Sequence, residues 1–368
     1  MVGKKKVRYA VVGAGWFAQE AVLPGFASAD NSELAAIVSG DPTKRRELGK
    51  KYGVPTFTYE QYDELLAGGT VDAVYIVLPN AMHREYTVRA AERKIHVLCE
   101  KPLAANRREC EEMIEACRRN GVRLMTAYRL HLESANLAAV QAIADGKIGE
   151  PRLFHGINSQ SVAEGNTRLE GDLKGGPLMD LGVYCINAAR YLFRDDPIEV
   201  TGFTASLPGE RFAEVPEMVS AVMRFPKDRL ATFSCGFGEA KVSEYRVIGT
   251  AGDIRLDPAY AFRGEIELSL TDDAGETKTS TYKERDQVGA ELHYFSECIR
   301  ADRDPEPDGV EGMIDLAIID AIKESIRTKA AVAVGAFPSK ARPTADQEIK
   351  LSKVSPPKLV KAGAPSGQ

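Results

Sequence analysis

Residues 7–18 read Val-Arg-Tyr-Ala-Val-Val-Gly-Ala-Gly-Trp-Phe-Ala, and this stretch decides the fold of the first part of the chain. A β-branched run leads into two glycines, and a helical pattern follows Ala18. Strand, glycine turn and helix in succession are the fingerprint of a dinucleotide-binding unit, in which alanine is permitted at the third glycine position. Because a helix N-terminus offers free N–H groups to a pyrophosphate, we expect the cofactor to bind at Gly13, Gly15, Trp16 and Phe17.

The end of the second predicted strand, residues 33–38, bears on the choice between NADP and NAD. An NAD-specific fold usually has an acid there that binds both ribose hydroxyls. Here the strand is followed by Ser39 and Gly40, and then by Lys44 and Arg45. A hydroxyl and cations suit a 2′-phosphate, which a carboxylate would repel. We therefore expect NADP. Two alternatives stay open: NAD bound through Asp41, and basic residues that merely face solvent.

The stretch Cys99-Glu100-Lys101-Pro102 follows a run that predicts a buried strand. Open α/β sheets place their ligands at the carboxyl ends of strands, where Lys101 stands. The proline disfavours helical geometry at Lys101, so the turn is stiff. Taken alone, the stretch fits a surface Glu-Lys pair before a turn equally well.

Strands and helices continue to alternate, with apolar strands predicted at residues 72–78, 95–99 and 122–127. Fully apolar strands that alternate with helices indicate a parallel sheet covered on both faces. The loops that follow these strands emerge at the same edge as the glycine turn, which adds Leu78, Pro79, Asn80 and Glu100 to the expected cofactor site. His83 begins a helix and either contacts the cofactor or caps that helix.

The pattern changes after Arg129. A helix is predicted at residues 134–145 and a strand at 151–159. Six strand-like runs then follow without helices, at 200–204, 218–225, 231–235, 245–249, 266–270 and 278–282, and they imply an antiparallel sheet. Helical patterns return at 291–300 and 310–329. A sheet covered by helices on one face leaves the other face free, so we expect a homodimer or homotetramer formed through that sheet.

One helix of this second half carries candidate catalytic groups. A helix that begins near Pro177, after Gly175 and Gly176, would place Asp180 and Tyr184 at positions i and i+4 on one face. A tyrosine beside an ammonium group is a plausible acid/base pair, because the cation favours the tyrosinate. The alternative is an amphipathic helix that packs Tyr184 into the core.

Length and composition set the outer limits. We expect 368 residues to form a Rossmann NADP-binding domain at 1–128, a substrate-binding and oligomerisation domain at 129–342, and a flexible tail rich in Lys, Pro, Ser and Gly at 343–368. The first is an α/β domain, and the second is an α+β domain with an open, mostly antiparallel sheet backed by helices. A net charge of -5 argues against nucleic acid as a partner. No run is long enough to cross a membrane.

The six cysteines show neither CxxC nor metal-ligand spacing, which predicts core thiols in a reducing compartment, and we expect a cytoplasmic protein. The five histidines are dispersed, so no metal site is predicted.

Over nearly its full length the chain resembles the glucose–fructose oxidoreductase/inositol dehydrogenase (Gfo/Idh/MocA) family. The resemblance rests on Val12-Gly13-Ala14-Gly15, Val38-Ser39-Gly40-Asp41, Leu78-Pro79-Asn80 with His83, Glu100-Lys101-Pro102, and Gly175-Gly176 leading to Asp180 and Tyr184. The run Ala127-Tyr128-Arg129-Leu130-His131 is similar to that of glucose–fructose oxidoreductase and its aldose-oxidising relatives. Unlike glucose–fructose oxidoreductase, the chain starts only a few residues before the first strand, so the resemblance does not extend to export or to permanently held NADP.

The resemblance implies hydride transfer between nicotinamide and C1 of a cyclic aldose, giving a lactone, with or without reduction of a second sugar. In the family the lysine lies beside the nicotinamide, so Lys101 takes that role, and Tyr184 would accept the hydroxyl proton while Asp180 positions the sugar. Weaker candidates for substrate contacts are Arg129, which is also a cofactor candidate, His131 and Arg168. Alternatives are a 1,5-anhydrofructose-type ketosugar reductase, a trans-dihydrodiol dehydrogenase and a catalytically silent NADP-binding regulator.

Overall fold

The computed structural model describes residues 5–338 and 342–366, and the chain divides into two compact units. Unit 1 comprises Met1–Arg129, Arg285–Met313 and Ile349–Gln368, and unit 2 comprises Leu130–Glu284 and Ile314–Glu348. The first boundary lies next to the one expected at residue 128. The chain then returns to unit 1 twice, whereas the sequence analysis had assigned residues 129–342 to a single continuous domain.

Unit 1 contains a six-stranded sheet in which all strands are parallel, in the order β3-β2-β1-β4-β5-β6. The strands are β1 (Val7–Val12), β2 (Ser32–Val38), β3 (Thr56–Phe57), β4 (Ala73–Ile76), β5 (His96–Glu100) and β6 (Leu124–Ala127). This confirms the Rossmann sheet, although the two-residue β3 was not predicted. The strand order reverses between β1 and β4, which is the switch point where such sheets bind ligands.

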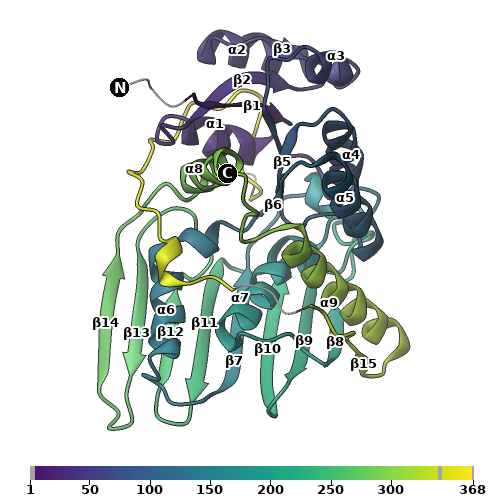
Figure 1. The fold of residues 1–368 in the computed structure, drawn as a ribbon. Coiled ribbons are helices and arrows are strands. Elements are labelled where there is room, and N and C mark those ends of the chain that lie inside the picture. Colours follow the sequence, from purple (N-terminus) through teal and green to yellow (C-terminus); the bar gives the residue numbers. More distant parts are fainter. Residues whose placement is uncertain (1–4, 339–341, 367–368) are drawn as a thin grey trace. The chain divides into compact units, whose positions relative to one another are not determined.

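Helices cover both faces of this sheet. They are η1 (Ala18–Val22), α1 (Leu23–Gly25), α2 (Pro42–Tyr52), α3 (Tyr62–Ala67), η2 (Asn80–Met82), α4 (His83–Glu92), α5 (Arg107–Asn120) and α8 (Gln287–Arg300). In Figure 1, α1 and α8 lie on one face and α4 and α5 on the other. Side-chain caps start two of the longer helices: the Asn106 side chain accepts from the Glu109 N–H at 3.0 Å, and Asp286 accepts from the Gly289 N–H at 2.9 Å.

Unit 2 is built on a nine-stranded sheet in the order β14-β13-β12-β11-β7-β10-β9-β8-β15. The β7–β10 pair is parallel and the other pairs are antiparallel, so the mostly antiparallel sheet is confirmed. The strands are β7 (Pro151–Ser159), β8 (Glu199–Ala205), β9 (Met218–Phe225), β10 (Arg229–Gly236), β11 (Val242–Gly249), β12 (Asp253–Asp257), β13 (Ile266–Thr271), β14 (Thr277–Tyr282) and β15 (Val332–Ala333). Neither β12 nor β15 was predicted.

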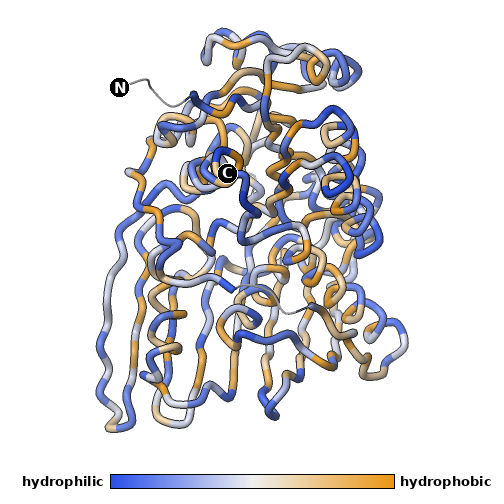
Figure 2. The backbone as a smooth tube through the Cα atoms, in the orientation of Figure 1, coloured by the Kyte–Doolittle hydropathy of each residue, from blue (hydrophilic) through white to orange (hydrophobic). Residues whose placement is uncertain are grey.

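One face of this second sheet is covered by helices. The remaining helical segments are η3 (Arg129–Leu132), α6 (Ser134–Ala144), η4 (Thr167–Leu169), η5 (Leu178–Gly182), α7 (Val183–Phe193), α9 (Gly309–Thr328) and η6 (Ala345–Gln347). Figure 1 shows α6, α7 and α9 on the same side of the sheet. Along β9, buried and exposed side chains alternate strictly, as expected for a strand with one covered face. Figure 2 shows hydrophobic and hydrophilic residues alternating along strands of this sheet.

The C-terminal stretch, expected to form a flexible tail, has specific contacts. Directly before this stretch, in unit 2, Arg342 is buried and donates to Asp196 at 2.7 Å. In unit 1, Ser352 forms a β-bridge with Arg285, and the Val360 N–H donates to Gln19 Oε1 at 2.7 Å. Its composition resembles that of a linker, but the backbone groups of Ser352 and Val360 have specific partners in unit 1, and the flexibility of the stretch stays a prediction.

All six cysteines are buried free thiols. Within residues 5–338 and 342–366, none of the helices combines the length and the apolar composition that crossing a bilayer requires. In the same ranges, no group of three or more His, Cys, Asp or Glu side chains is arranged to hold a metal ion.

Candidate active site

The glycine turn after β1 has the geometry of a dinucleotide cradle. Gly13 has φ +104°, and a Cβ there would lie 2.2 Å from the Val77 carbonyl oxygen, so only glycine fits. Gly15 is exposed, and a Cβ built on it would meet nothing within 4 Å. Space beside Gly15 and the start of a helix are what a pyrophosphate needs, and the residues therefore fit a dinucleotide. The half-buried side chains of Trp16 and Phe17 follow directly.

Cations and one helix-capping acid, Asp41, follow the end of β2. Ser39 is buried, and its carbonyl accepts from Arg45 Nη1 at 2.6 Å. Asp41 begins α2: its Oδ1 accepts the N–H groups of Thr43 at 2.7 Å and Lys44 at 2.9 Å. These bonds, with the Lys44 contact first, lower the pKa of Asp41. One carboxylate oxygen is thus already used as a helix cap.

His83 lies buried between two loops of unit 1. Its ring is fully buried, with Nε2 2.8 Å from the Leu78 carbonyl oxygen and Nδ1 3.0 Å from that of Pro102. Burial lowers the pKa of His83 and favours the neutral ring. A neutral ring has one N–H and donates to one of these carbonyls, and it lies between the loop after β4 and the Lys101-Pro102 turn. No part of the ring reaches solvent, and its contact with the cofactor stays a prediction, whereas the capping alternative is wrong because the N-cap of α4 is Met82.

Behind Lys101, two carboxyl groups share one phenol. The Tyr75 hydroxyl lies 2.8 Å from Glu100 Oε1 and 3.3 Å from Glu291 Oε2. Burial raises the pKa of Glu100, against the opposing charge of Lys101, and burial with the neighbouring Glu100 raises the pKa of Glu291 well above its ordinary value. The half-buried Lys101 thus follows a carboxyl group whose pKa is raised by burial and partly lowered again by Lys101 itself.

Arg129 contributes positive charge to the same cluster. It is almost fully buried and its Nη1 donates to Gln287 Oε1. Its charge lowers the pKa of both Glu100 and Glu291 against the effect of burial. This gives Arg129 a structural use in unit 1, and its contact with cofactor or substrate stays a prediction.

In unit 2 a glycine pair folds a polar loop onto the start of a helix. Gly176 has φ +102°, and a Cβ on Gly175 would lie 2.2 Å from the Arg168 carbonyl oxygen. The Gly176 N–H donates to that carbonyl at 2.8 Å. As a result, Arg168 Nε reaches Asp180 Oδ2 at 2.8 Å, and both side chains remain partly exposed. Two residues that the sequence analysis treated separately therefore form an ion pair.

The helix that carries Asp180 and Tyr184 begins irregularly. Residues Leu178–Gly182 form the π-helical turn η5, and Tyr184 lies in the following α-helix α7. The expected continuous α-helix is therefore wrong over its first turn. Tyr184 is half-buried, with its ring 5.9 Å from that of Tyr260. The core-packing alternative thus accounts for one side of the ring only.

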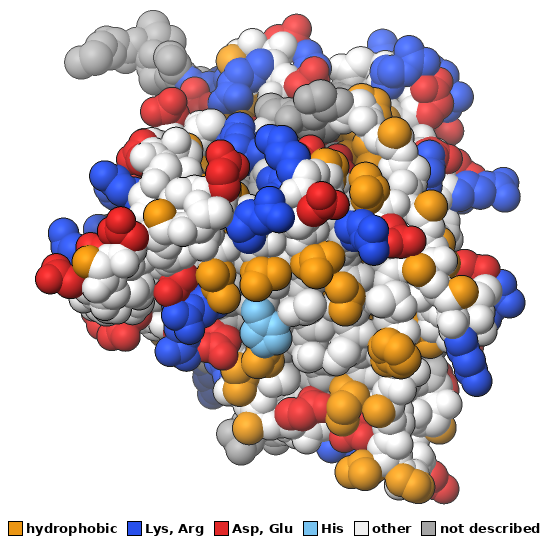
Figure 3. Space-filling model, turned by 90° about the horizontal axis from the view of Figure 1, so that it is seen from below, with side chains coloured by type: hydrophobic (Ala, Val, Ile, Leu, Met, Phe, Trp, Pro, Cys, Tyr) orange, Lys and Arg blue, Asp and Glu red, His pale blue; other side chains and the backbone are white. Residues whose placement is uncertain are grey.

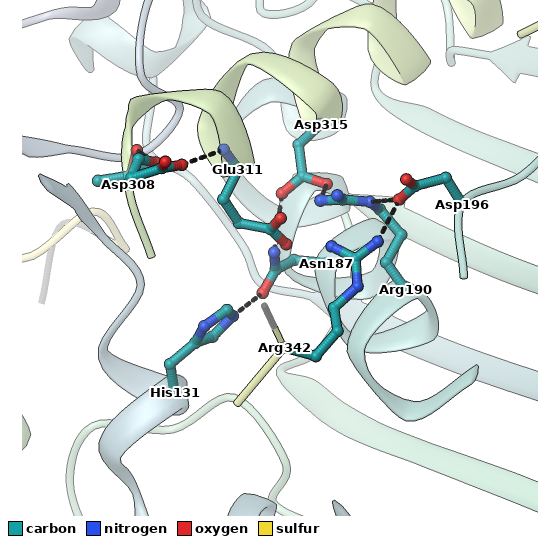
Figure 4. Close-up of polar contacts among 9 residues, drawn as sticks. His131, Asn187, Arg190, Asp196, Asp308, Glu311, Asp315 and Arg342 are labelled. Atoms are coloured by element: carbon teal, nitrogen blue, oxygen red, sulfur yellow. Dashed lines mark hydrogen bonds and ion pairs between the residues drawn. The ribbon is translucent and has the colours of Figure 1, made fainter. Parts of the chain in front are cut away.

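His131 belongs to a buried network, shown in Figure 4. It is fully buried, and its Nε2 lies 2.8 Å from Asn187 Oδ1. Because the Asn187 amide donates to Asp315 at 3.0 Å, its oxygen accepts from His131, which fixes the proton on Nε2. Asp315 also accepts from Arg190 at 2.6 Å. His131 therefore organises the core of unit 2, and its contact with a substrate stays a prediction.

Sequence reasoning missed Tyr75, Glu291 and Gln19. Tyr75 lies in an apolar strand and Glu291 in an amphipathic helix, where neither residue stands out. The two meet across 216 positions in sequence. Gln19 lies one residue beyond the glycine fingerprint, and its partner is 341 positions away.

Comparison with known proteins places the chain in a family. Residues 7–128 match the NAD-binding Rossmann-fold model of the Gfo/Idh/MocA oxidoreductase family, and residues 136–255 match the C-terminal domain model of the same family. The chain belongs to the Gfo/Idh/MocA family and is an NAD(P)-dependent oxidoreductase, as the resemblance implied.

Individual relatives cover most of the chain. It is 35% identical over 335 residues to the NADP(+) D-xylose 1-dehydrogenase of Haloarcula marismortui, covering 89% of this chain and 92% of that protein. It is 32% identical to D-xylose 1-dehydrogenase (NADP(+)) 2 of Haloferax volcanii, covering 88% and 98%. Among solved structures, aldose-aldose oxidoreductase of Caulobacter crescentus, complexed with glycerol, aligns with a TM-score of 0.85 at 34% identity, covering 89% of this chain and 100% of that one.

Proposed function

We propose that this protein is an NADP-dependent sugar oxidoreductase that transfers a hydride from C1 of a cyclic aldose and releases the aldonolactone. One observation carries the proposal: relatives that share about a third of their residues with nearly the whole chain are named for aldose oxidation. The chain also has Lys101 directly after β5, Asp180 in η5 and Tyr184 in α7. A silent regulator would not need these residues.

The proposed chemistry assigns one task to each side chain. NADP, when bound, supplies the ring that accepts the hydride. Tyr184 accepts the proton of the C1 hydroxyl, and the Lys101 ammonium stabilises the developing alkoxide and the tyrosinate. The C1–H bonding electrons leave with the hydride as the C1–O double bond forms. Asp180, held by Arg168, accepts a hydrogen bond from a sugar hydroxyl.

The preference for NADP follows from the end of β2. Lys44 and Arg45 bring two cations to the first turn of α2, and Ser39 replaces the acid expected for NAD. Asp41 is engaged as a helix cap and so is less suited to bind a ribose diol. We infer that the adenosine 2′-phosphate is accepted here.

The face of the nine-stranded sheet that helices do not cover suits a second copy of the chain. Leu153 is 45% exposed, Leu230 40% and Ile248 38%, and the three lie side by side across β10, β7 and β11. Figure 3 shows hydrophobic side chains gathered around a histidine on one side of the molecule. Exposed apolar rows of this kind mark interaction surfaces. We infer a homo-oligomer formed through this face.

The test is reduction of NADP and NAD by the purified protein across aldoses, with xylose and glucose first. We expect turnover with NADP, and its loss by about a hundredfold or more in Lys101→Met and in Tyr184→Phe while the fold is kept. A folded variant that retains wild-type turnover would refute its residue's role. Turnover only with ketosugars and NADPH would identify a reductase, and no turnover with bound NADP would favour the regulator.

A further inference from the structure

The C-terminal segment 351–361, here named the strap, lies against the dinucleotide-binding unit. It begins beside α8, where the Asp286 N–H donates to the Leu351 carbonyl at 3.3 Å and Ser352 bridges to Arg285. Further along, the Lys358 carbonyl accepts from Lys51 at 3.4 Å. These partners all belong to unit 1, as does the strap. Figure 1 shows the strap as the yellow trace that runs over this unit.

One buried side chain ties the strap to the glycine turn. Gln19 is only 1% exposed, and its Nε2 donates both to the Ala14 carbonyl at 3.0 Å and to the Val360 carbonyl at 2.9 Å. Its Oε1 accepts the Val360 N–H at 2.7 Å. The amide therefore pairs with the strap as a neighbouring strand would. The contact uses the carbonyl of the turn, whereas a pyrophosphate would bind N–H groups.

The next residue of the strap places a cation at the end of β2. Lys361 has φ +45°, a left-handed backbone conformation that is uncommon for lysine and is held by the Val360 pairing. Its Nζ lies 3.3 Å from Asp41 Oδ2, and its side chain is 58% exposed. An exposed ion pair of this kind contributes little to stability. Asp41 follows the strand whose end faces the adenosine ribose in this fold.

We propose that the strap is part of the cofactor site, and that Lys361 contacts the adenosine 2′-phosphate and sets the preference for NADP over NAD. The inference rests on the proposed use of NADP. Lys361 offsets the charge of Asp41, which alone would repel a phosphate, and joins Lys44 and Arg45 around the same position. A cation carried by the end of the chain, 316 positions beyond Arg45, completes a site that the local sequence leaves only partly basic.

The test is binding, measured by calorimetry on the full-length protein with NADP, NAD, adenosine 2′,5′-bisphosphate and 5′-AMP. For Lys361→Ala we expect affinity for NADP and for the bisphosphate to fall by about tenfold or more, and affinity for NAD and 5′-AMP to stay within about twofold. Lys361→Glu should lower the affinity for NADP and for the bisphosphate further. Lys358→Ala is the matched control, because it removes the same charge from the same strap and should bind all four ligands as the wild type does.

A second variant, truncated after Lys353, tests the strap itself. It should lose the same discrimination between NADP and NAD. Unchanged NADP affinity in Lys361→Ala would overturn the proposal, and so would tighter binding of both dinucleotides by the truncated chain, which would instead mark the strap as an obstruction. A wild type that binds NADP but oxidises no sugar would refute the proposed function and leave this inference standing.

Discussion

Glu100 and Glu291 are two carboxyl groups that the folded protein keeps protonated more readily than the unfolded chain does. Both have a raised pKa, chiefly through burial. Between the ordinary glutamate value of 4.5 and the raised values, the unfolded chain releases protons that the folded protein retains. Stability is therefore fully present below the ordinary value and falls as pH rises through the interval. The two buried carboxyl groups therefore lower the stability of the protein at neutral pH.

We predict that Glu291→Gln makes the protein less sensitive to pH. An amide of the same shape can still bond to Tyr75 but carries no charge to bury. The loss of unfolding free energy between about pH 5 and about pH 8 should shrink by on the order of 1–3 kcal/mol. Urea unfolding at the two pH values measures this, with the exposed Glu64→Gln as control. An unchanged slope would show that Glu291 is already charged in the folded protein.

The two glycines of the fingerprint separate folding from binding, again at the residue scale. Gly13→Ala meets the Val77 carbonyl and a forbidden φ, so it should destabilise unit 1 by about 1–3 kcal/mol or more and abolish dinucleotide binding. Gly15→Ala meets nothing and should fold normally while it weakens binding, because its methyl group enters the cradle. Thermal unfolding and NADP titration distinguish the two variants. Equal stability losses would contradict this account.

At the scale of elements, the site candidates lie on irregular starts of helices. A π-helical turn follows the glycine turn as η1, and another, η5, carries Asp180. Such turns are rare and occur frequently at functional sites. Each lets a helix begin close to a loop that carries polar groups, which is how Arg168 meets Asp180. A regular helical pattern in the sequence cannot reveal the extra residue of such a turn.

The pairing of α7 with α9 through Arg190 and Asp315 gives the prediction at this scale. Both side chains are fully buried. Asp315→Ala leaves Arg190 paired with Asp196. It takes a buried acceptor from both Arg190 and Asn187, so it should cost about 3 kcal/mol of unfolding free energy. Glu199→Ala breaks the exposed pair with Arg224 and should cost under about 1 kcal/mol. Denaturant unfolding measures the loss of unfolding free energy in each variant. Similar losses in the two would refute a structural role for the network in Figure 4.

At the scale of the whole molecule, local patterns predicted both sheets but not what joins distant segments. The glycine turn and Lys101 were found because their determinants are adjacent in sequence. The Gln19–Val360 and Tyr75–Glu291 contacts have no local signature. A glutamine that pairs with one backbone N–H and one carbonyl leaves no periodic pattern in the sequence. The burial of His83 and His131 could not be predicted for the same reason: a polar residue beside a motif resembles a ligand-binding group until its burial is known. The short β12 was missed because five residues with charged ends resemble a loop.

The free sheet face gives the prediction at this scale. Leu230→Asp places a charge in the centre of the apolar row formed with Leu153 and Ile248, and should convert the proposed oligomer to monomers. Light scattering coupled to gel filtration measures the mass. Leu207→Asp, which changes an exposed leucine outside the strands, should leave the mass unchanged. A wild type that is monomeric at working concentration would contradict the proposal.

The most direct measurement is the fate of deuterium placed at C1 of the aldose that the protein turns over. The proposed mechanism requires that hydrogen to leave as hydride. Mass spectrometry should find deuterium in the reduced NADP, and turnover should slow with the labelled sugar if hydride transfer limits the rate. Lys101→Met should form neither deuterated reduced NADP nor lactone. Reduced NADP without deuterium would mean that another carbon is oxidised, and the assignment as an aldose C1 dehydrogenase would be wrong.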